Sequence, residues 1–126
     1  MSMLKVIMCP AERPPYVTNI SGSLENMQKI VGGYIETVTI DTSSGPIVIV
    51  CNEDGRIQDL PENRSLFLDG FCGDCFICGV SGEEFADIPE GIRIKMLRLC
   101  KKHWDAIKES QQVIPDFYGE REDFDA

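Results

Sequence analysis

The sequence predicts a single α+β domain, with a mixed or antiparallel sheet of about four to five strands packed by one short and one long helix. Three observations lead to this prediction. The chain has 126 residues, 43% of them hydrophobic, which is enough for one core and short for two. Several short apolar runs are rich in β-branched residues and end at glycine, proline or asparagine, as strands do. Two other segments repeat apolar residues at the spacing of a helix face.

The first elements are a strand and a short helix. Residues 5–9 are apolar and precede Pro10, which ends regular pairing and cannot continue a helix. Residues 24–31 carry apolar side chains at helical spacing. Ser23 is placed to accept a hydrogen bond from a first-turn amide, and Gly32 to adopt the left-handed geometry that ends a helix. We therefore expect a strand, a stiff connection and a helix over residues 24–31.

The middle of the chain predicts a hairpin and a further strand. Residues 34–41 and 47–51 are rich in β-branched residues and are joined by a short turn containing Gly-Pro, a pattern typical of a β-hairpin. The second run is apolar at every position, as expected of a central strand covered on both faces. Residues 75–80 form another apolar run and are followed by Ser-Gly. We expect all three runs to be strands of one sheet.

The last long element is a helix over residues 88–112. Asp87 and Glu90 lie three residues apart and Pro89 falls in the first turn, a pattern typical of a helix start. Residues 115–126 follow Ile114 with five acidic side chains against one arginine. We therefore divide the chain into an α+β domain over residues 1–114 and an acidic, mobile tail over residues 115–126.

Charge is distributed unevenly along the chain. The formal net charge is −9, yet residues 91–108 hold six basic side chains against one acidic, a net of +5 that leaves −14 for the rest. The acidic background disfavours nucleic acid as a partner and favours the solvated face of an amphipathic helix as the role of the basic segment. No apolar run approaches the roughly 18 residues of a membrane span, so we expect no membrane association.

Cysteine usage favours a reducing compartment. The first ten residues lack the basic leader and cleavage site of a secretory signal, so we expect a cytoplasmic protein with free thiols and without a cofactor. The six cysteines are Cys9, Cys51, Cys72, Cys75, Cys78 and Cys100.

Four side chains have the spacing of a structural zinc site. Cys75 and Cys78 form a Cys-x-x-Cys pair, and Cys100 and His103 form a Cys-x-x-His pair. This alternative requires a loop around the first pair. If residues 75–80 form a strand, Cys75 and Cys78 point to opposite faces and cannot share an ion. The interpretation we adopt is a strand and no metal site, with zinc held by Cys75, Cys78, Cys100 and His103 as the alternative.

Five short motifs together resemble a family of small domains of unknown function encoded by phages and conjugative elements. In order they are Val31-Gly32-Gly33-Tyr34-Ile35-Glu36, Asn52-Glu53-Asp54-Gly55, Leu60-Pro61-Glu62-Asn63-Arg64, Phe76-Ile77-Cys78-Gly79 and Gly82-Glu83-Glu84-Phe85. The resemblance runs from about Lys5 to Leu99. It implies a compact α+β domain with residues 76–80 on a strand, and it provides no catalytic or binding residue to carry over.

The sequence presents one isolated candidate for acid or base chemistry. Strand alternation places Glu36 on the same face as Val38 and Ile40, and a carboxylate among apolar neighbours is a candidate for a perturbed pKa. The alternatives are a position at the sheet margin or a pair with a base such as Arg64. His103 is the one histidine of the chain. It lies with Cys100 on an apolar helix face with no evident oxyanion site, so we expect no enzyme and no catalytic residue.

These observations predict a non-enzymatic accessory protein of a phage or mobile element that acts by binding a protein partner of unknown identity. The first alternative is a zinc-stabilised domain that contacts nucleic acid through the basic helix segment over residues 91–108. The second alternative is an acidic DNA mimic that blocks restriction enzymes, since the rest of the chain carries −14. The sequence leaves the oligomeric state open.

Overall fold

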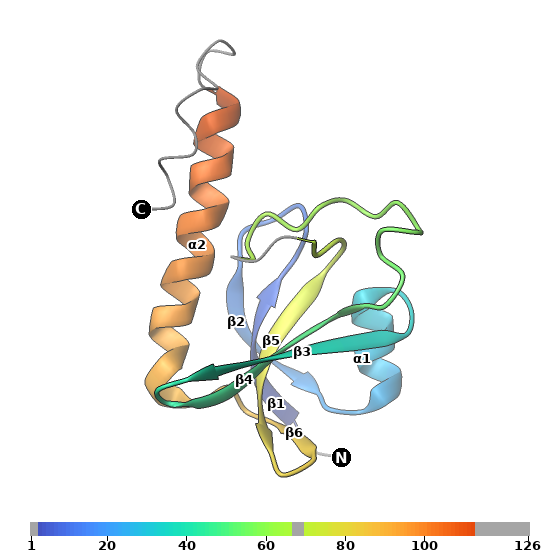
Figure 1. The fold of residues 1–126 in the computed structure, drawn as a ribbon, viewed down its shortest axis with the longest axis vertical. Coiled ribbons are helices and arrows are strands. Elements are labelled where there is room, and N and C mark those ends of the chain that lie inside the picture. The colour runs from blue at the N-terminus through green and yellow to red at the C-terminus, as the bar shows by residue number, and fades with distance from the viewer. Residues whose placement is uncertain (1–2, 67–69, 113–126) are drawn as a thin grey trace.

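The structure is a computed structural model that describes residues 3–66 and 70–112, with only the backbone of residues 107–112. Figure 1 shows a central sheet with one helix on each side. The elements in chain order are β1 (Met3–Cys9), β2 (Tyr16–Ser21), α1 (Leu24–Val31), β3 (Ile35–Thr42), β4 (Gly45–Asn52), β5 (Cys75–Ser81), β6 (Glu84–Ala86) and α2 (Glu90–Gln112). The predicted α+β class is confirmed.

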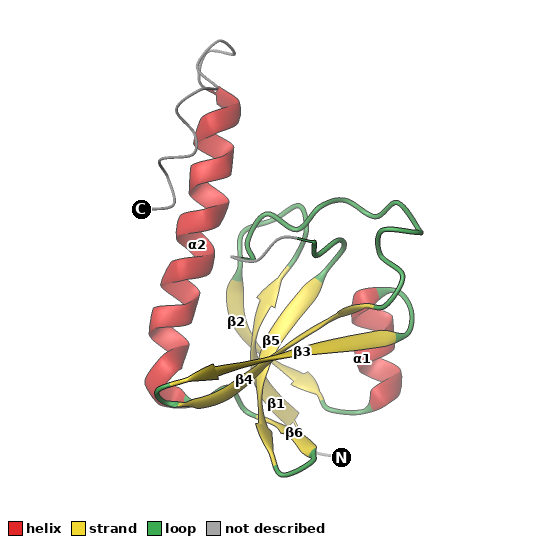
Figure 2. Cartoon of the chain, viewed as in Figure 1, coloured by secondary structure: helices red, strands yellow, loops and turns green. Residues whose placement is uncertain are grey.

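The sheet is antiparallel throughout, in the order β2-β1-β5-β4-β3, with β6 paired to β5. Figure 2 shows this sheet between the two helices. The expected hairpin is β3–β4, closed by Thr42 and Gly45, and the strand expected at residues 75–80 is β5. The strands β2 and β3 are at the two ends of this order, and in the described sheet the short β6 pairs with β5 alone. Each end strand therefore has one side without a strand partner among the described residues.

Two strands were not predicted from the sequence. β2 is an edge strand in which only Ile20 is buried, so its apolar pattern is weak. β6 has three residues, which is too short to give a periodic signal. Their addition brings the sheet to six strands, one more than the upper end of the expected range.

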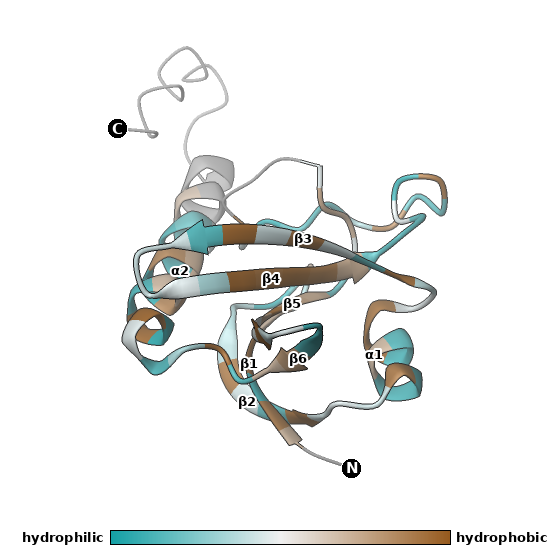
Figure 3. Cartoon of the chain, turned by 60° about the horizontal axis from the view of Figure 1, so that its bottom comes forward, coloured by the Kyte–Doolittle hydropathy of each residue, from teal (hydrophilic) through white to brown (hydrophobic). Residues whose placement is uncertain are grey.

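Both faces of the sheet carry an apolar layer. One layer packs against α2 and contains Ile7, Ile49, Ile77, Ile92 and Met96. The other packs against α1 and contains Val6, Met27, Val31, Val50 and Phe76. Because β4 contributes to both layers, its run from Ile47 to Cys51 is buried at every position, as predicted, and the burial continues to Asn52. Figure 3 shows β4 as strongly apolar and β3 as alternating.

Both helices lie where the sequence predicted them. The Ser23 hydroxyl accepts a hydrogen bond from the Asn26 amide at 3.1 Å, and Gly32 ends α1 with φ +82°. α2 begins at Glu90, two residues after the expected start, and its C-terminal part extends beyond the sheet (Figure 1). No described helix is both long enough and apolar enough to cross a membrane. The acidic tail expected at residues 115–126 lies outside the described residues.

Candidate functional site

The structure does not bring the four side chains of the zinc alternative together. Residues 75–81 form the strand β5, so Cys75 lies in the layer beside α2 and Cys78 in the layer beside α1. The zinc alternative needed a loop here, and a sheet now separates two of its four ligands. Among the residues that the structure describes, no group of three or more histidine, cysteine or acidic side chains is arranged to hold a metal ion.

The structure instead groups a different set of thiols. Cys9 and Cys75 are direct neighbours across β1 and β5, and Cys100 of α2 lies in the same layer. A hydrogen bond with Cys100, together with burial, raises the pKa of the Cys9 thiol well above its ordinary value. Burial likewise raises the pKa of the Cys75 thiol, and that of Cys78 to about 12. Cys9, Cys75 and Cys78 therefore stay protonated at neutral pH, as buried structural cysteines do.

Two motif asparagines organise the long connection between β4 and β5. The buried Asn63 amide donates to the carbonyls of Cys9 (2.8 Å) and Gly73 (2.9 Å). Its side-chain oxygen accepts from the amides of Ser65 (3.1 Å) and Leu66 (3.3 Å). Asn63 therefore ties the connection both to itself and to the end of β1.

Asn52 joins the start of the same connection to the end of α1. Its amide nitrogen donates to the Val31 carbonyl at 3.0 Å, and its oxygen accepts from the Asp54 amide at 2.7 Å. A Cβ at Gly33 would lie 2.9 Å from the Asn52 amide nitrogen, so only glycine fits there without a shift. Gly33 thus allows the end of α1 to lie directly against the Asn52 side chain.

The glycine of a third motif marks a close backbone crossing. A Cβ at Gly79 of β5 would overlap the Asp87 carbonyl oxygen. The segment that crosses there is fixed by two hydrogen bonds with β1, from the Lys5 amide to the Asp87 carboxylate (2.7 Å) and from the Ile88 amide to the Lys5 carbonyl (2.9 Å). Gly79 therefore allows the chain to pass over the sheet into α2.

The outer side of β3 presents main-chain groups without a strand partner in the described part of the chain. Just before β3, the Tyr34 carbonyl accepts from the Glu53 amide at 2.8 Å, in continuation of the β3–β4 register. Hydrogen-bonded pairs alternate along an antiparallel ladder, so the even-numbered residues of β3 bond to β4. The odd-numbered residues direct their N–H and C=O groups outward; they are Ile35, Thr37, Thr39 and Asp41. We call this row the β3 edge.

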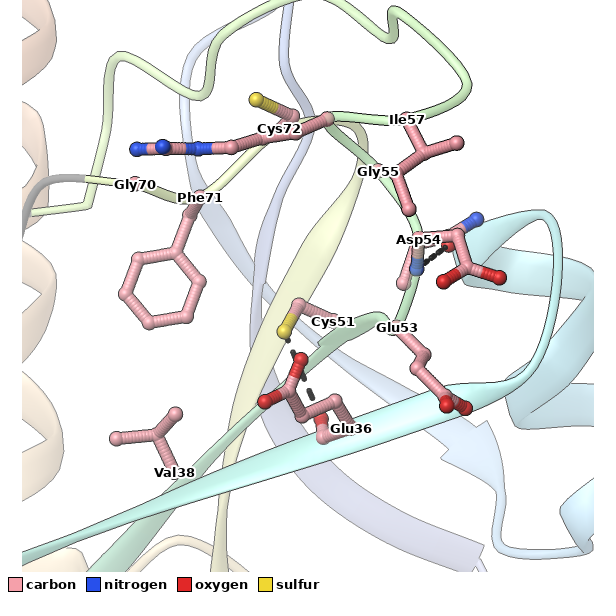
Figure 4. Close-up of a pocket in the computed structure, with 12 residues that line it drawn as sticks. Glu36, Val38, Cys51, Glu53, Asp54, Gly55, Ile57, Gly70, Phe71 and Cys72 are labelled. Carbon is pink, nitrogen blue, oxygen red and sulfur yellow. Dashed lines mark hydrogen bonds between the residues drawn. The ribbon is translucent and has the colours of Figure 1, made fainter.

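A cavity of about 380 Å³ adjoins the β3 edge on the α2 side of the sheet. Figure 4 shows the Glu36 carboxylate beside the Cys51 thiol, with Val38 and the Phe71 ring facing the same space. The residues that line the cavity come from β3, β4 and the connection; they are Glu36, Val38, Cys51, Asn52, Glu53, Asp54, Gly55, Arg56, Ile57, Gly70, Phe71 and Cys72. Its lining holds three acidic side chains and one basic.

Glu36 is the predicted site residue that lies in this cavity. It shares a face with Val38, as strand alternation predicted, and it is exposed at the sheet margin, as the alternative interpretation proposed. Arg56, and not Arg64, is the basic residue that lines the cavity. Burial, and then the Glu36 charge, raises the pKa of the Cys51 thiol to about 11.

No local pattern in the sequence predicts the remaining parts of this cavity. Phe71 lies 35 positions after Glu36 in the chain, and the connection alone brings it to β3. One signal was available, because Ile57 is an apolar residue in a turn-rich segment, and the structure leaves it 84% exposed at the cavity.

The basic segment of α2 lies apart from this cavity. Lys95, Arg98, Lys101 and Lys102 are exposed, whereas Ile92, Met96 and Cys100 pack on the sheet. This division is the amphipathic pattern that the sequence predicted.

Comparison with known proteins identifies the family. The family model described as Domain of unknown function (DUF3846) matches residues 3–101. The chain belongs to this family. The match covers both apolar layers, the two asparagines and the β3 edge of this DUF3846 domain. No curated protein and no solved structure matches the chain.

Proposed function

We propose that this DUF3846 domain is a non-enzymatic accessory module that binds a protein partner by pairing the β3 edge with an extended segment of that partner. The observation that carries this proposal is the row of outward main-chain groups on alternate residues of β3. An added strand gains affinity from main-chain hydrogen bonds, each contributing about 1 kcal/mol net, and specificity from neighbouring side-chain pockets.

The composition of β3 supports this role. Natural edge strands are commonly protected by proline, lysine or a bulge. β3 holds neither proline nor lysine and pairs with β4 in unbroken register over all eight residues. Glu36 and Asp41 are its charged side chains, and the outward N–H and C=O groups of Thr37 and Thr39 lie between them, open to a further strand.

The chemistry of the cavity supports binding over catalysis. Its Cys51 thiol has a pKa of about 11 and is protonated at neutral pH, which makes it a poor nucleophile. His103 lies on α2 and is not among the residues that line the cavity. The Cys51 thiol and the one histidine therefore form no pair of nucleophile and general base in this cavity.

The test is selection of peptides from a random displayed library on the full-length protein. We expect selected peptides to bind at least tenfold more weakly to the Thr39→Pro variant, which removes one outward N–H while leaving the β3–β4 bonds intact. The control Thr39→Val keeps the N–H, and its affinity should stay within about threefold of the original.

A second arm leaves the protein untouched. Backbone N-methylation of a selected peptide should weaken binding at every second position, because alternate amides of a strand face its neighbour. Selection of no peptide, or an N-methylation profile without this period of two, would overturn the proposal.

The origin in a phage or mobile element is the second part of the proposal, and it is supported by the five ordered motifs. The measurement is the gene neighbourhood in the source genome. We expect replication, packaging or conjugation genes on both sides, and a location among housekeeping genes would contradict this origin.

The two alternative functions stay predictions with their own tests. Nucleic-acid binding through residues 91–108 predicts a salt-dependent shift of labelled DNA that Lys101→Glu with Lys102→Glu weakens. A DNA mimic predicts that the protein inhibits a restriction enzyme at stoichiometric concentration. If peptides are selected that bind at the β3 edge, and neither the DNA shift nor the inhibition is observed, protein binding is the supported function.

A further inference from the structure

We infer that the partner segment carries a lysine or arginine side chain that enters the cavity beside β3, with an apolar side chain two residues away. This inference rests on the proposed function and specifies the class of partner. The predicted segment is extended. At every second position it carries the cationic residue or an apolar residue, and the residues between them face the other side of the sheet.

The face of β3 determines this pattern. Side chains of paired strands project to the same face of the sheet at matched positions. Every second side chain of an added strand therefore lies next to the β3 side chains on one face. On the α2 face these side chains are Glu36, Val38 and Ile40. Glu36 is exposed and charged, whereas Val38 and Ile40 are half-buried and apolar. A complementary strand therefore places a cation beside Glu36 and apolar side chains beside the other two.

The cavity extends the site for the cationic residue. Its volume of about 380 Å³ is several times that of a single side chain, and its mouth carries the Glu36 carboxylate. Glu53 and Asp54 add negative charge from the connection, against Arg56 alone. The Phe71 ring and Val38 provide an apolar wall for the methylene groups of a lysine or arginine side chain, and an aromatic ring attracts a cation placed over its face.

The same charges oppose a second copy of this chain as the occupant. Antiparallel pairing of two β3 strands would bring the acidic side chains Glu36 and Asp41 of both copies into one short ladder, with no lysine or arginine on either strand. These four carboxylates would share one ladder without a compensating cation, and each copy carries a net charge of −9, so the two copies repel each other. Charge complementarity therefore favours a cationic segment of a different protein.

The experiment compares defined peptides on the full-length protein. The probe alternates threonine with lysine, valine and isoleucine at its second, fourth and sixth positions, and is prepared in both sequence orders because an added strand binds in either direction. Matched probes replace the lysine with leucine or glutamate. We expect the lysine peptide to bind at least tenfold more tightly than the glutamate peptide and about threefold more tightly than the leucine peptide in low salt.

Charge-removing variants locate the effect. Glu36→Gln should reduce the ratio of the affinities for the lysine and leucine peptides to about one. Glu84→Gln is the matched control, because it removes one exposed carboxylate from β6 on a different part of the sheet. The preference should also weaken as salt increases, since the charges at the mouth are exposed.

The outcomes separate this inference from the proposed function. Equal affinity for the lysine and glutamate peptides, with binding still lost in Thr39→Pro, overturns the cationic site and leaves pairing at the β3 edge in place. An equal effect of Glu84→Gln and Glu36→Gln also overturns it, because the preference would then reflect overall charge. If none of the defined peptides binds although library selection yields peptides that pair with the β3 edge, this inference alone fails. If library selection also yields no peptide, both proposals fail.

Discussion

The strand β3 precedes β4 in the chain and the connection over residues 53–66 and 70–74 follows it, and the two segments use their polar groups in opposite ways. In the connection, the Asn63 side chain alone makes four hydrogen bonds within the domain. Along β3, alternate main-chain groups point outward, and the Glu36 carboxylate lies at a cavity. Asn63 therefore holds the scaffold together, whereas the groups that we propose for partner binding lie on the edge strand β3.

The largest expected effect is a loss of stability when the Asn63 side chain is removed. Asn63→Ala leaves the Cys9 and Gly73 carbonyls and the Ser65 and Leu66 amides without their side-chain partner in a buried position. Since each unsatisfied buried group costs about 1–3 kcal/mol, we expect the free energy of unfolding to fall by about 3–5 kcal/mol. Urea denaturation measures this loss.

The matched control is Asn19→Ala on the edge strand β2, where the asparagine is exposed. This change should alter the free energy of unfolding by no more than about 0.5 kcal/mol. Under conditions where Asn63→Ala is still folded, its affinity for a β3-edge peptide should match that of the original protein. A loss below about 1 kcal/mol in Asn63→Ala would contradict the role of this residue in holding the connection.

A smaller expected effect concerns the buried Cys78 thiol and the dependence of the free energy of unfolding on pH. The folded state raises the pKa of Cys78 to about 12, while an unfolded thiol titrates near 8.5. Below about pH 8.5 both states keep the proton, and above it only the unfolded state releases it. Stability should therefore fall as pH rises from about 8.5 toward 12, with a contribution of up to about 1.4 kcal/mol per pH unit from this thiol.

The measurement is urea denaturation between pH 7.5 and 9.5 for the original protein and Cys78→Ala. The variant should be less stable at every pH, because it loses a buried side chain, and its stability should decline less steeply with pH. Identical slopes for the two proteins would show that Cys78 keeps an ordinary pKa in the folded state, contrary to its burial between β5 and α1.

Local patterns in the sequence were sufficient to predict most of the scaffold. The capping residues Ser23 and Gly32 predicted the bounds of α1, and the fully apolar run in β4 predicted a central strand with layers on both faces. The alternation of faces also predicted that Cys75 and Cys78 could not share an ion if residues 75–80 formed a strand, and they lie in separate layers. These predictions succeeded because each depends on neighbours close in the chain.

The candidate site could not be predicted in the same way, because it depends on contacts between distant segments. Glu36 was identified from its strand, yet its neighbours Arg56 and Phe71 come from a connection with no regular pattern. The position of β3 at the edge follows from the strand order β5-β4-β3, which no local pattern encodes. The thiol neighbours Cys9 and Cys100 are 91 positions apart for the same reason.

The most direct test of the central claim is amide hydrogen exchange along β3, resolved by residue with NMR, in the free protein and with a selected peptide. In the free protein, we expect slow exchange at Glu36, Val38 and Ile40 and fast exchange at Thr37 and Thr39, because only the first set bonds to β4. Saturating peptide should slow exchange at Thr37 and Thr39. Slow exchange at these two residues without peptide, or fast exchange at both with peptide bound, would contradict pairing at the β3 edge.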